Sequence, residues 1–374
     1  MSSPRSLLWA IVLTVACGTA EPEVGPSDGF VLADVADVAA AASWPGLPTD
    51  VPTTLGAYGF FEADALASER PVPGVIAYDV NAPLWSDRAV KHRFIALPPG
   101  GAMVFDPDGV FDLPVGAVLI KSFGFPLSFD DPASPVRLVE TRLLVHEAAG
   151  WRPQIYLWNA EQTEATRLVP GRIIPVEYEL GGVKESHSYV VPNSNQCKDC
   201  HAKEKTVGPI GITARQLDRE VGNTSQLNAL EAAGALTGVS GTWTPLEDPY
   251  GDGALDARAR AWLDANCGHC HRPGGEGGPS GLVLEANATA SDLGACKTPV
   301  AAGPASGDAQ YDIFPGEPDA SILVKRITTL DPGNKMPELP NLLPDEAGIA
   351  LIRAWILAMD GAGCDATGLP TEGQ

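Results

Sequence analysis

The sequence predicts two folded parts, an antiparallel β domain followed by a helical domain, after a non-globular N-terminal stretch. Three observations lead to this prediction. Short runs rich in β-branched and aromatic residues, separated by Gly and Pro, fill residues 51–191. Amphipathic patterns of helical period replace them after Pro192. The 374 residues are also enough for two ordinary domains, each with its own core.

The first part of the chain, residues 1–20, has the layout of a secretory signal peptide. Arg5 supplies a positive charge, residues 7–15 form an apolar run, and Gly18–Ala20 resemble a cleavage site. The run is too short to span a bilayer as a helix. Cys17 leaves a second outcome open, a lipoprotein signal in which this cysteine is acylated. We expect an exported protein, in the periplasm or anchored to the outer membrane or cell surface, with no transmembrane segment in the mature chain.

Residues 21–50 are dominated by Pro, Ala, Asp and Glu and have few large apolar side chains, so we expect a disordered tether. The β domain follows at 51–191. Its runs and turn signals favour antiparallel strands in a sandwich or partial barrel. The clearest runs are 115–123, 139–145, 153–158 and 188–191.

The helical part has three amphipathic stretches. One follows Asn223 and Thr224, one covers 254–266, and one covers 345–359. We divide this part of the chain into a helical segment 192–250, a domain 251–364 and a flexible tail 365–374.

A five-residue pattern, C-x-x-C-H, occurs twice in the helical part, at Cys197–His201 and Cys267–His271. It takes four of the seven cysteines and two of the six histidines. Two cysteines three residues apart at a helical turn face the same side, so both sulfurs can bond the two vinyl groups of one porphyrin. The histidine that follows then binds the iron. The pattern predicts two covalently attached haem c groups. The attachment residues are Cys197, Cys200, Cys267 and Cys270, and the iron ligands are His201 and His271.

Three other interpretations of the cysteines fit the pattern less well. A zinc ribbon places its two C-x-x-C knuckles nearer each other and needs no histidine after each. A thioredoxin-like dithiol follows a strand of a βαβ unit, and neither motif does. Structural disulfides between the motifs would leave both histidines without a role. His269, inside the second motif, points away from its iron, and we interpret it as a solvent-exposed residue.

Sulfur and imidazole donors elsewhere are candidates for the other axial position of each iron. Two prolines hold the loop around Met336 extended, so we expect Met336 on the second haem, where Met/His ligation raises the reduction potential. Met359 continues the apolar stripe of the last helix and is expected in the core. Residues 202–266 hold neither Met nor His, so the first haem would take a ligand from the β domain or keep an open position. The candidates are His187, which lies closest, His146, His92 and Met103.

Two cysteines remain outside the motifs and the signal, Cys296 and Cys364. They are an even pair in an oxidising compartment. We expect a disulfide between them that closes a long loop, and two free thiols are the alternative.

Residues 252–364 resemble the class I cytochrome c fold, with a helix, C-x-x-C-H, a loop, a Met-Pro ligand loop at 336–337 and a final helix in this order. Over 55–364 the chain is similar to a family of exported bacterial dihaem c-type cytochromes of unassigned role. The stretches that carry this resemblance are LWSD at 84–87, PVGAVLIKSF at 114–123, VPNSNQCKDCH at 191–201, ARQLDRE at 214–220, CKTPVAAG at 296–303, PGEPDASILVKRI at 315–327 and MPEL at 336–339. The resemblance implies a helical cytochrome c-like domain, haem on the four motif cysteines, and His201, His271 and Met336 on iron. It implies no substrate.

The net charge of −22 argues against a nucleic-acid role, because phosphate backbones would repel the protein. We predict a carrier that transfers electrons between exported or membrane redox partners. A basic redox protein or a membrane electron-transfer complex suits the charge. The alternative is a haem enzyme of the peroxidase or oxidase type with an open site at the first haem. A third hypothesis is a binding protein whose haems only report redox state.

Overall fold

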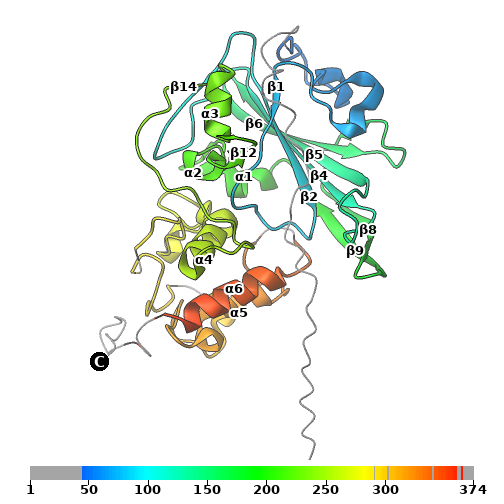
Figure 1. Ribbon diagram of the computed structural model, residues 1–374. Coiled ribbons are helices and arrows are strands. Elements are labelled where there is room, and N and C mark those ends of the chain that lie inside the picture. Colours follow the sequence, from blue (N-terminus) through cyan, green and yellow to red (C-terminus); the bar gives the residue numbers. More distant parts are fainter. Residues whose placement is uncertain (1–43, 290, 301–302, 339–340, 360–363, 365–374) are drawn as a thin grey trace, which may run out of the picture.

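A six-stranded antiparallel sheet is the largest element of this computed structural model (Figure 1). The structure describes residues 44–289, 291–300, 303–338, 341–359 and 364. Each strand of the sheet runs opposite to its neighbours. In spatial order the strands are β1 (Val75–Ala77), β2 (Val90–Ala96), β4 (Val118–Pro126), β5 (Val136–Glu147), β6 (Gly150–Trp158) and β7 (Ala165–Arg167).

The predicted signal 1–20 with Cys17, most of the predicted tether and the predicted tail 365–374 lie outside the described residues. The chain joins the core before residue 50. Trp44 is fully buried, and its indole N–H donates to the carbonyl oxygen of Tyr58 at 2.8 Å.

Alternating side chains of the sheet divide between its two faces. On one face Ile120 and Leu143 pack with Trp44 in a core built partly by the first described segment. Lys121 and Arg142 alternate with these apolar residues and therefore point to the opposite face. That face borders a cavity, and both cations line it.

A separate hairpin, β8 (Arg172–Leu180) and β9 (Val183–Val191), packs its apolar side chains against Phe123 and Phe125 of β4. Two-residue strand pairs complete the β structure. They are β3 (Met103–Val104) with β14 (Leu236–Thr237), β10 (Ala202–Lys203) with β11 (Thr206–Val207), and β12 (Glu220–Val221) with β13 (Thr224–Ser225).

The α-helices of the described residues are short, and the longest has 12 residues. They are α1 (Gln196–His201), α2 (Ala214–Leu217), α3 (Gln226–Ala232), α4 (Leu255–Leu263), α5 (Ile322–Thr328) and α6 (Glu346–Leu357). Figure 1 shows α4, α5 and α6 together below the sheet. Within the described part of the chain, no helix combines the length and the apolar character that crossing a bilayer requires.

The predicted fold class is wrong, because the described residues hold no helical cytochrome c-like domain. Strands dominate the structure, and the sheet stays open with β1 and β7 at its edges. Helix α4 does pack on α6 through Trp262 and Ile352. Most of the chain between them forms turns and loops, with α5 as one short helix. The physical reason is the Gly- and Pro-rich composition of stretches such as 273–281, which favours turns over helices.

Residues 84–87 tie the sheet to the C-terminal part. The backbone N–H of Trp85 donates to Asn266 Oδ1 at 2.8 Å, and its indole N–H donates to the carbonyl oxygen of Leu343 at 2.9 Å. The Asp87 carboxylate accepts the backbone N–H groups of Leu342 and Leu343 at 2.8 to 2.9 Å. These bonds fix the second C-x-x-C-H motif relative to the sheet, because Asn266 immediately precedes it.

Candidate functional site at the two cysteine motifs

The first motif forms helix α1, which begins shortly after strand β9 ends. Asn193 lies in the turn between them, and its side-chain oxygen accepts the backbone N–H groups of Asn195 and Gln196 at 2.9 and 3.1 Å. These bonds satisfy N–H groups that the start of a helix leaves without partners. Cys197 and Cys200 lie three residues apart in this helix, so their sulfurs share one face.

The second motif continues helix α4 through a π-helical turn, Asp264–Gly268. The backbone N–H groups of Cys270 and His271 both donate to the carbonyl oxygen of Cys267, at 3.0 and 2.9 Å. The motif therefore keeps a helical backbone, and the buried Asn266 anchors its start to Trp85 in the loop between β1 and β2.

The histidines of the two motifs are held in the same way. His201 Nδ1 lies 2.9 Å from the carbonyl oxygen of Gly208, and because a carbonyl only accepts, this nitrogen carries the proton. His271 Nδ1 lies 3.1 Å from Ser280 Oγ. The Ser280 hydroxyl donates to the carbonyl oxygen of Gly277 at 2.6 Å, so it accepts from the ring. In both rings the lone pair is on Nε2, which is the nitrogen left for a metal.

Burial keeps both imidazoles neutral near pH 7. It lowers the pKa of His201 to about 4, and it also lowers the pKa of His271. Neutral imidazole is the form that binds a metal. Burial raises the pKa of Cys267 to about 12 and raises the pKa of Cys197 as well. These two sulfurs are therefore thiols near neutral pH.

The two motifs touch although they lie far apart in the sequence. Cys270 Sγ lies 3.7 Å from the carbonyl oxygen of Asp199. The Cys200 and Cys270 sulfurs lie close together, and their interaction raises the pKa of Cys200 and lowers that of Cys270. His269 joins this contact, and the three side chains bring one ligand atom each within 4.8 Å of one another. Sequence reasoning missed this contact, since no local pattern in one motif specifies the other.

The interpretation of His269 as a solvent-exposed residue is wrong, because this residue is only 6% exposed. The sequence argument considered the His269 ring only relative to the second motif. In the structure, Cys200 of the first motif lies beside His269 and Cys270. Cys200, His269 and Cys270 could hold a zinc ion, but structural zinc takes four protein ligands and the described residues supply three here. A zinc site would also leave His201 and His271 unexplained.

A cavity of about 590 Å³ opens beside the first motif. Its volume lies within the range of cofactor and ligand pockets, about 300–1,000 Å³. The lining residues that matter most are Cys197, Cys200 and His201 of the first motif, His269 and Arg272 at the second, and Arg93, Lys121 and Arg142 of the sheet. Arg272 Nε is buried and has no hydrogen-bond partner among the described residues.

A buried charge network fixes Arg142 at the cavity wall. Its guanidinium donates two hydrogen bonds to the Glu140 carboxylate, at 2.6 and 3.0 Å, and lies 4.2 Å from the centroid of the Phe123 ring. The Tyr189 hydroxyl donates to the same carboxylate at 2.8 Å. Glu140 is fully buried, so its charge depends on these partners. Sequence reasoning missed this network, although a Glu and an Arg inside the apolar run 139–145 were a usable signal.

Met336, the predicted ligand of the second haem, is half-buried, and its backbone N–H donates to the carbonyl oxygen of Arg326 at 2.8 Å. Burial is the main cause of the lowered pKa of His271, and the Arg326 charge adds to it. The Met336 contact is with the Arg326 backbone, and it does not by itself bring the Met336 sulfur to His271. Met359 packs against the core of α4, α5 and α6, as predicted.

The candidates for the first haem do not line the cavity. His187 lies in β9, with Nδ1 3.3 Å from the Tyr178 hydroxyl and its ring edge against Phe125. The other three candidates are held by contacts elsewhere in the fold. His92 Nδ1 lies 2.6 Å from the Glu69 carboxylate, His146 stacks on Trp151, and Met103 is buried in a core with α2 and α3. Among the described lining residues the histidines are His201 and His269, and there is no methionine.

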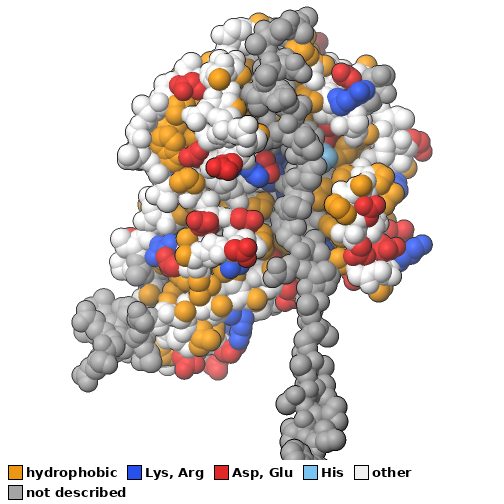
Figure 2. Space-filling view, viewed as in Figure 1, with side chains coloured by type: hydrophobic (Ala, Val, Ile, Leu, Met, Phe, Trp, Pro, Cys, Tyr) orange, Lys and Arg blue, Asp and Glu red, His pale blue; other side chains and the backbone are white. Residues whose placement is uncertain are grey.

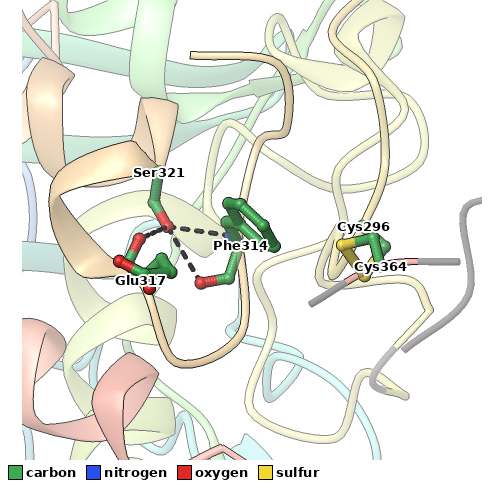
Figure 3. Close-up of a disulfide and its surroundings, with 5 residues drawn as sticks. All are labelled: Cys296, Phe314, Glu317, Ser321 and Cys364. Atoms are coloured by element: carbon green, nitrogen blue, oxygen red, sulfur yellow. Dashed lines mark hydrogen bonds between the residues drawn. A yellow bond between two sulfur atoms is a disulfide. The ribbon is translucent and has the colours of Figure 1, made fainter. Parts of the chain in front are cut away.

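Cys296 and Cys364 form a disulfide (Figure 3). It joins the loop after the second motif to the chain just past α6. Figure 3 also shows how the chain turns into α5, where Ser321 Oγ accepts the Phe314 N–H at 2.8 Å and donates to the carbonyl oxygen of Glu317 at 3.0 Å. The loop closed by the disulfide contains Met336, α5 and α6.

Comparison of this chain with protein-family models, curated proteins and solved structures finds no match. The resemblance to dihaem cytochromes is therefore a prediction that depends on the motifs. The functional argument depends on the geometry of the two motifs and the cavity beside them.

Proposed function

We propose that this protein is a c-type cytochrome that carries two covalently attached haem groups and transfers electrons. The attachment residues would be Cys197 and Cys200 for the first haem, and Cys267 and Cys270 for the second. The observation that carries the proposal is that His201 and His271 are oriented and protonated in the same way. Each is largely buried and neutral and is anchored through Nδ1, so Nε2 is left to bind iron.

The residues around the first motif fit a haem group in size and chemistry. The cavity has the volume of a cofactor pocket, and the buried Arg272 Nε lacks a partner there among the described residues. When bound, haem supplies one-electron chemistry. The chain would hold each iron by a neutral imidazole. The contact between Cys200 and Cys270 would bring the attachment edges of the two haems together, so an electron could pass between them inside the protein.

For the second haem we propose Met336 as the ligand opposite His271. The order of helix, C-x-x-C-H and Met-Pro loop in the sequence supports this assignment. Met/His ligation would make the second haem the better electron acceptor of the two.

The first haem decides between an electron carrier and a haem enzyme. If its iron has two protein ligands, His269 is the imidazole that the cavity offers besides His201. If the second position is open, small molecules such as peroxide could reach the iron, and an enzyme of the peroxidase or oxidase type is the second candidate function. The absence of His187 from the cavity lining leaves room for an open position, whereas the buried position of His269 at the cavity favours the six-coordinate carrier.

The surface charge suits a basic partner. Acidic side chains are spread over the face shown in Figure 2, including the region of the β8–β9 hairpin. With a net charge of −22, the protein would attract a positively charged redox protein or the basic surface of a membrane electron-transfer complex at low ionic strength. The signal-like residues 1–20 support an exported protein, so its partner would lie outside the cytoplasm, and Cys17 would be the acylation site if the mature protein is a lipoprotein.

The test uses protein made in a host that matures c-type cytochromes, with each motif disabled in turn. C197A/C200A and C267A/C270A should each keep one haem, seen as half the haem absorbance per protein, and the combined variant should be colourless. A C296S/C364S variant serves as the control, because it removes two cysteines but should keep both haems. Full haem content in either motif variant would contradict the proposal.

A further inference from the structure

The chain after the second motif turns back onto the imidazole of His271. It passes through several Gly and Pro residues and forms a short turn at Gly278–Ser280. This turn brings Ser280 beside the ring, with Oγ 3.1 Å from His271 Nδ1. We call residues 277–282 the histidine loop, because its contacts hold this one ring.

The Ser280 hydroxyl uses all of its hydrogen-bonding capacity within the histidine loop and on the ring. It donates to the carbonyl oxygen of Gly277 at 2.6 Å and accepts the backbone N–H of Leu282 at 3.2 Å. A hydroxyl has one proton and two lone pairs, so a single lone pair is left to face His271. Only an N–H can complete this set. Ser280 therefore fixes the ring proton on Nδ1 and leaves Nε2 for a metal.

Gly277 fixes the plane of the same ring. A Cβ built at Gly277 would lie 3.0 Å from each of three ring atoms of His271, Cγ, Nδ1 and Cε1. A point equally distant from three atoms of a ring lies over its face, so the Gly277 backbone covers one face of the imidazole. The backbone angles of Gly277, φ −81° and ψ −5°, are open to any residue. The need for glycine here comes from the closeness of the ring.

The imidazole of the first motif has a different hydrogen-bond acceptor. His201 Nδ1 donates to the backbone carbonyl oxygen of Gly208 at 2.9 Å. A carbonyl oxygen carries more negative charge than a hydroxyl oxygen and is the stronger acceptor. A stronger acceptor on Nδ1–H makes the imidazole a more basic ligand, which favours ferric iron. His201 would therefore donate more electron density to its iron than His271 does.

We propose that Ser280 is a positioning residue for the second haem, whose hydroxyl orients His271 and holds the electron donation of this ring below that of His201. This inference depends on the proposed function, because it requires a haem on Cys267 and Cys270. The effect adds to that of Met336, which is proposed for the opposite side of the iron. Both raise the potential of the second haem above that of the first.

The test is redox titration of the matured holoprotein carrying Ser280→Ala. The ring N–H then loses its acceptor and the imidazole becomes a weaker donor, so the potential of the second haem should rise while that of the first stays unchanged. A purely structural role predicts the opposite sign, because a loosened loop would admit water, which stabilises the charge of ferric haem and lowers the potential. A lowered or unchanged potential in Ser280→Ala would overturn the proposal.

A second variant shifts the potential in the other direction. Ser280→Asn can still donate to the Gly277 carbonyl, but it offers the ring a carbonyl oxygen, as Gly208 does for His201. The potential of the second haem should fall, and a rise would contradict the proposal.

Ser306 supplies a matched control. It ends a similar short turn, Gly303–Ser306, and its hydroxyl donates to the carbonyl oxygen of Gly303 at 2.8 Å. Ser306→Ala should leave both potentials unchanged, and a shift like that of Ser280→Ala would overturn the assignment to the His271 contact. C197A/C200A, which should keep only the second haem, identifies the signal of that haem in the titration. Failure of the proposed function is distinct, since the second motif would then carry no haem to titrate.

Discussion

The sequence separation of Cys296 and Cys364 predicts how much their disulfide stabilises the folded protein. We consider the double variant C296S/C364S, which leaves all motif cysteines in place. The two cysteines are 68 residues apart in sequence. On the chain-entropy model, closing a loop of that length stabilises the folded protein by about 4 kcal/mol, because the unfolded chain loses freedom. We therefore expect the variant to lose about this much free energy of unfolding.

The assay is urea denaturation of the wild-type and variant holoproteins, followed by intrinsic tryptophan fluorescence, to which Trp262 and Trp355 in the core of α4 and α6 contribute. A drop in the midpoint at constant slope measures the change in stability. The same loop contains Met336, so loss of Met–iron absorption in the variant should begin at lower urea than global unfolding. A stability loss below about 1 kcal/mol would refute the loop argument, since the entropy model then would not describe this chain.

The remaining predictions concern ligands and packing. Met336→Ala should lower the potential of the second haem, because a thioether ligand raises it, and redox titration measures the shift. His269→Ala should convert the first haem from low-spin to high-spin iron that binds cyanide, as seen by electron paramagnetic resonance of the oxidised protein. Asp345→Ala should cost about 2–4 kcal/mol in urea unfolding. It removes the acceptor of the Trp262 indole at 2.7 Å and the Tyr250 hydroxyl at 2.6 Å, and it removes the N-cap of α6.

The two variants of proposed iron ligands each have a control. Met359→Leu should keep the potential that Met336→Ala loses, because Met359 is a core residue. His146→Ala should leave the first haem unchanged, because His146 stacks on Trp151 outside the cavity lining. A high-spin first haem in the unaltered protein would favour the enzyme over the carrier.

Local elements could be predicted from the sequence where one physical signal dominates. The β-branched run 139–145 lies within β5, and 153–158 lies within β6, since such side chains suit a pleated, half-buried surface. The apolar stripe at 345–359 corresponds to α6, where Asp345 accepts the Gly348 N–H as an N-cap.

Local sequence patterns could not predict the fold class, because it depends on how segments distant in the sequence pair and pack. The helices expected over 254–266 and 345–359 do form, as α4 continued by the π-helical turn Asp264–Gly268 and as α6, but the Gly- and Pro-rich chain between them forms mostly turns. The segment after the first motif returns to the β part instead of forming a helical unit, because β14 pairs with β3.

The candidate site was predictable only in its parts. The spacing of each motif identifies the cysteines and histidines that act together. Three features arise from long-range packing that no window of sequence reports: the contact between Cys200 and Cys270, the burial of His269, and the strand register that aligns Arg93, Lys121 and Arg142.

The most direct test of the account is the intact mass of the protein from a host that matures c-type cytochromes, measured under denaturing conditions that release any non-covalent cofactor. Covalent attachment at both motifs predicts a polypeptide heavier by two haem groups. A mass equal to that of the bare processed polypeptide would contradict the central claim.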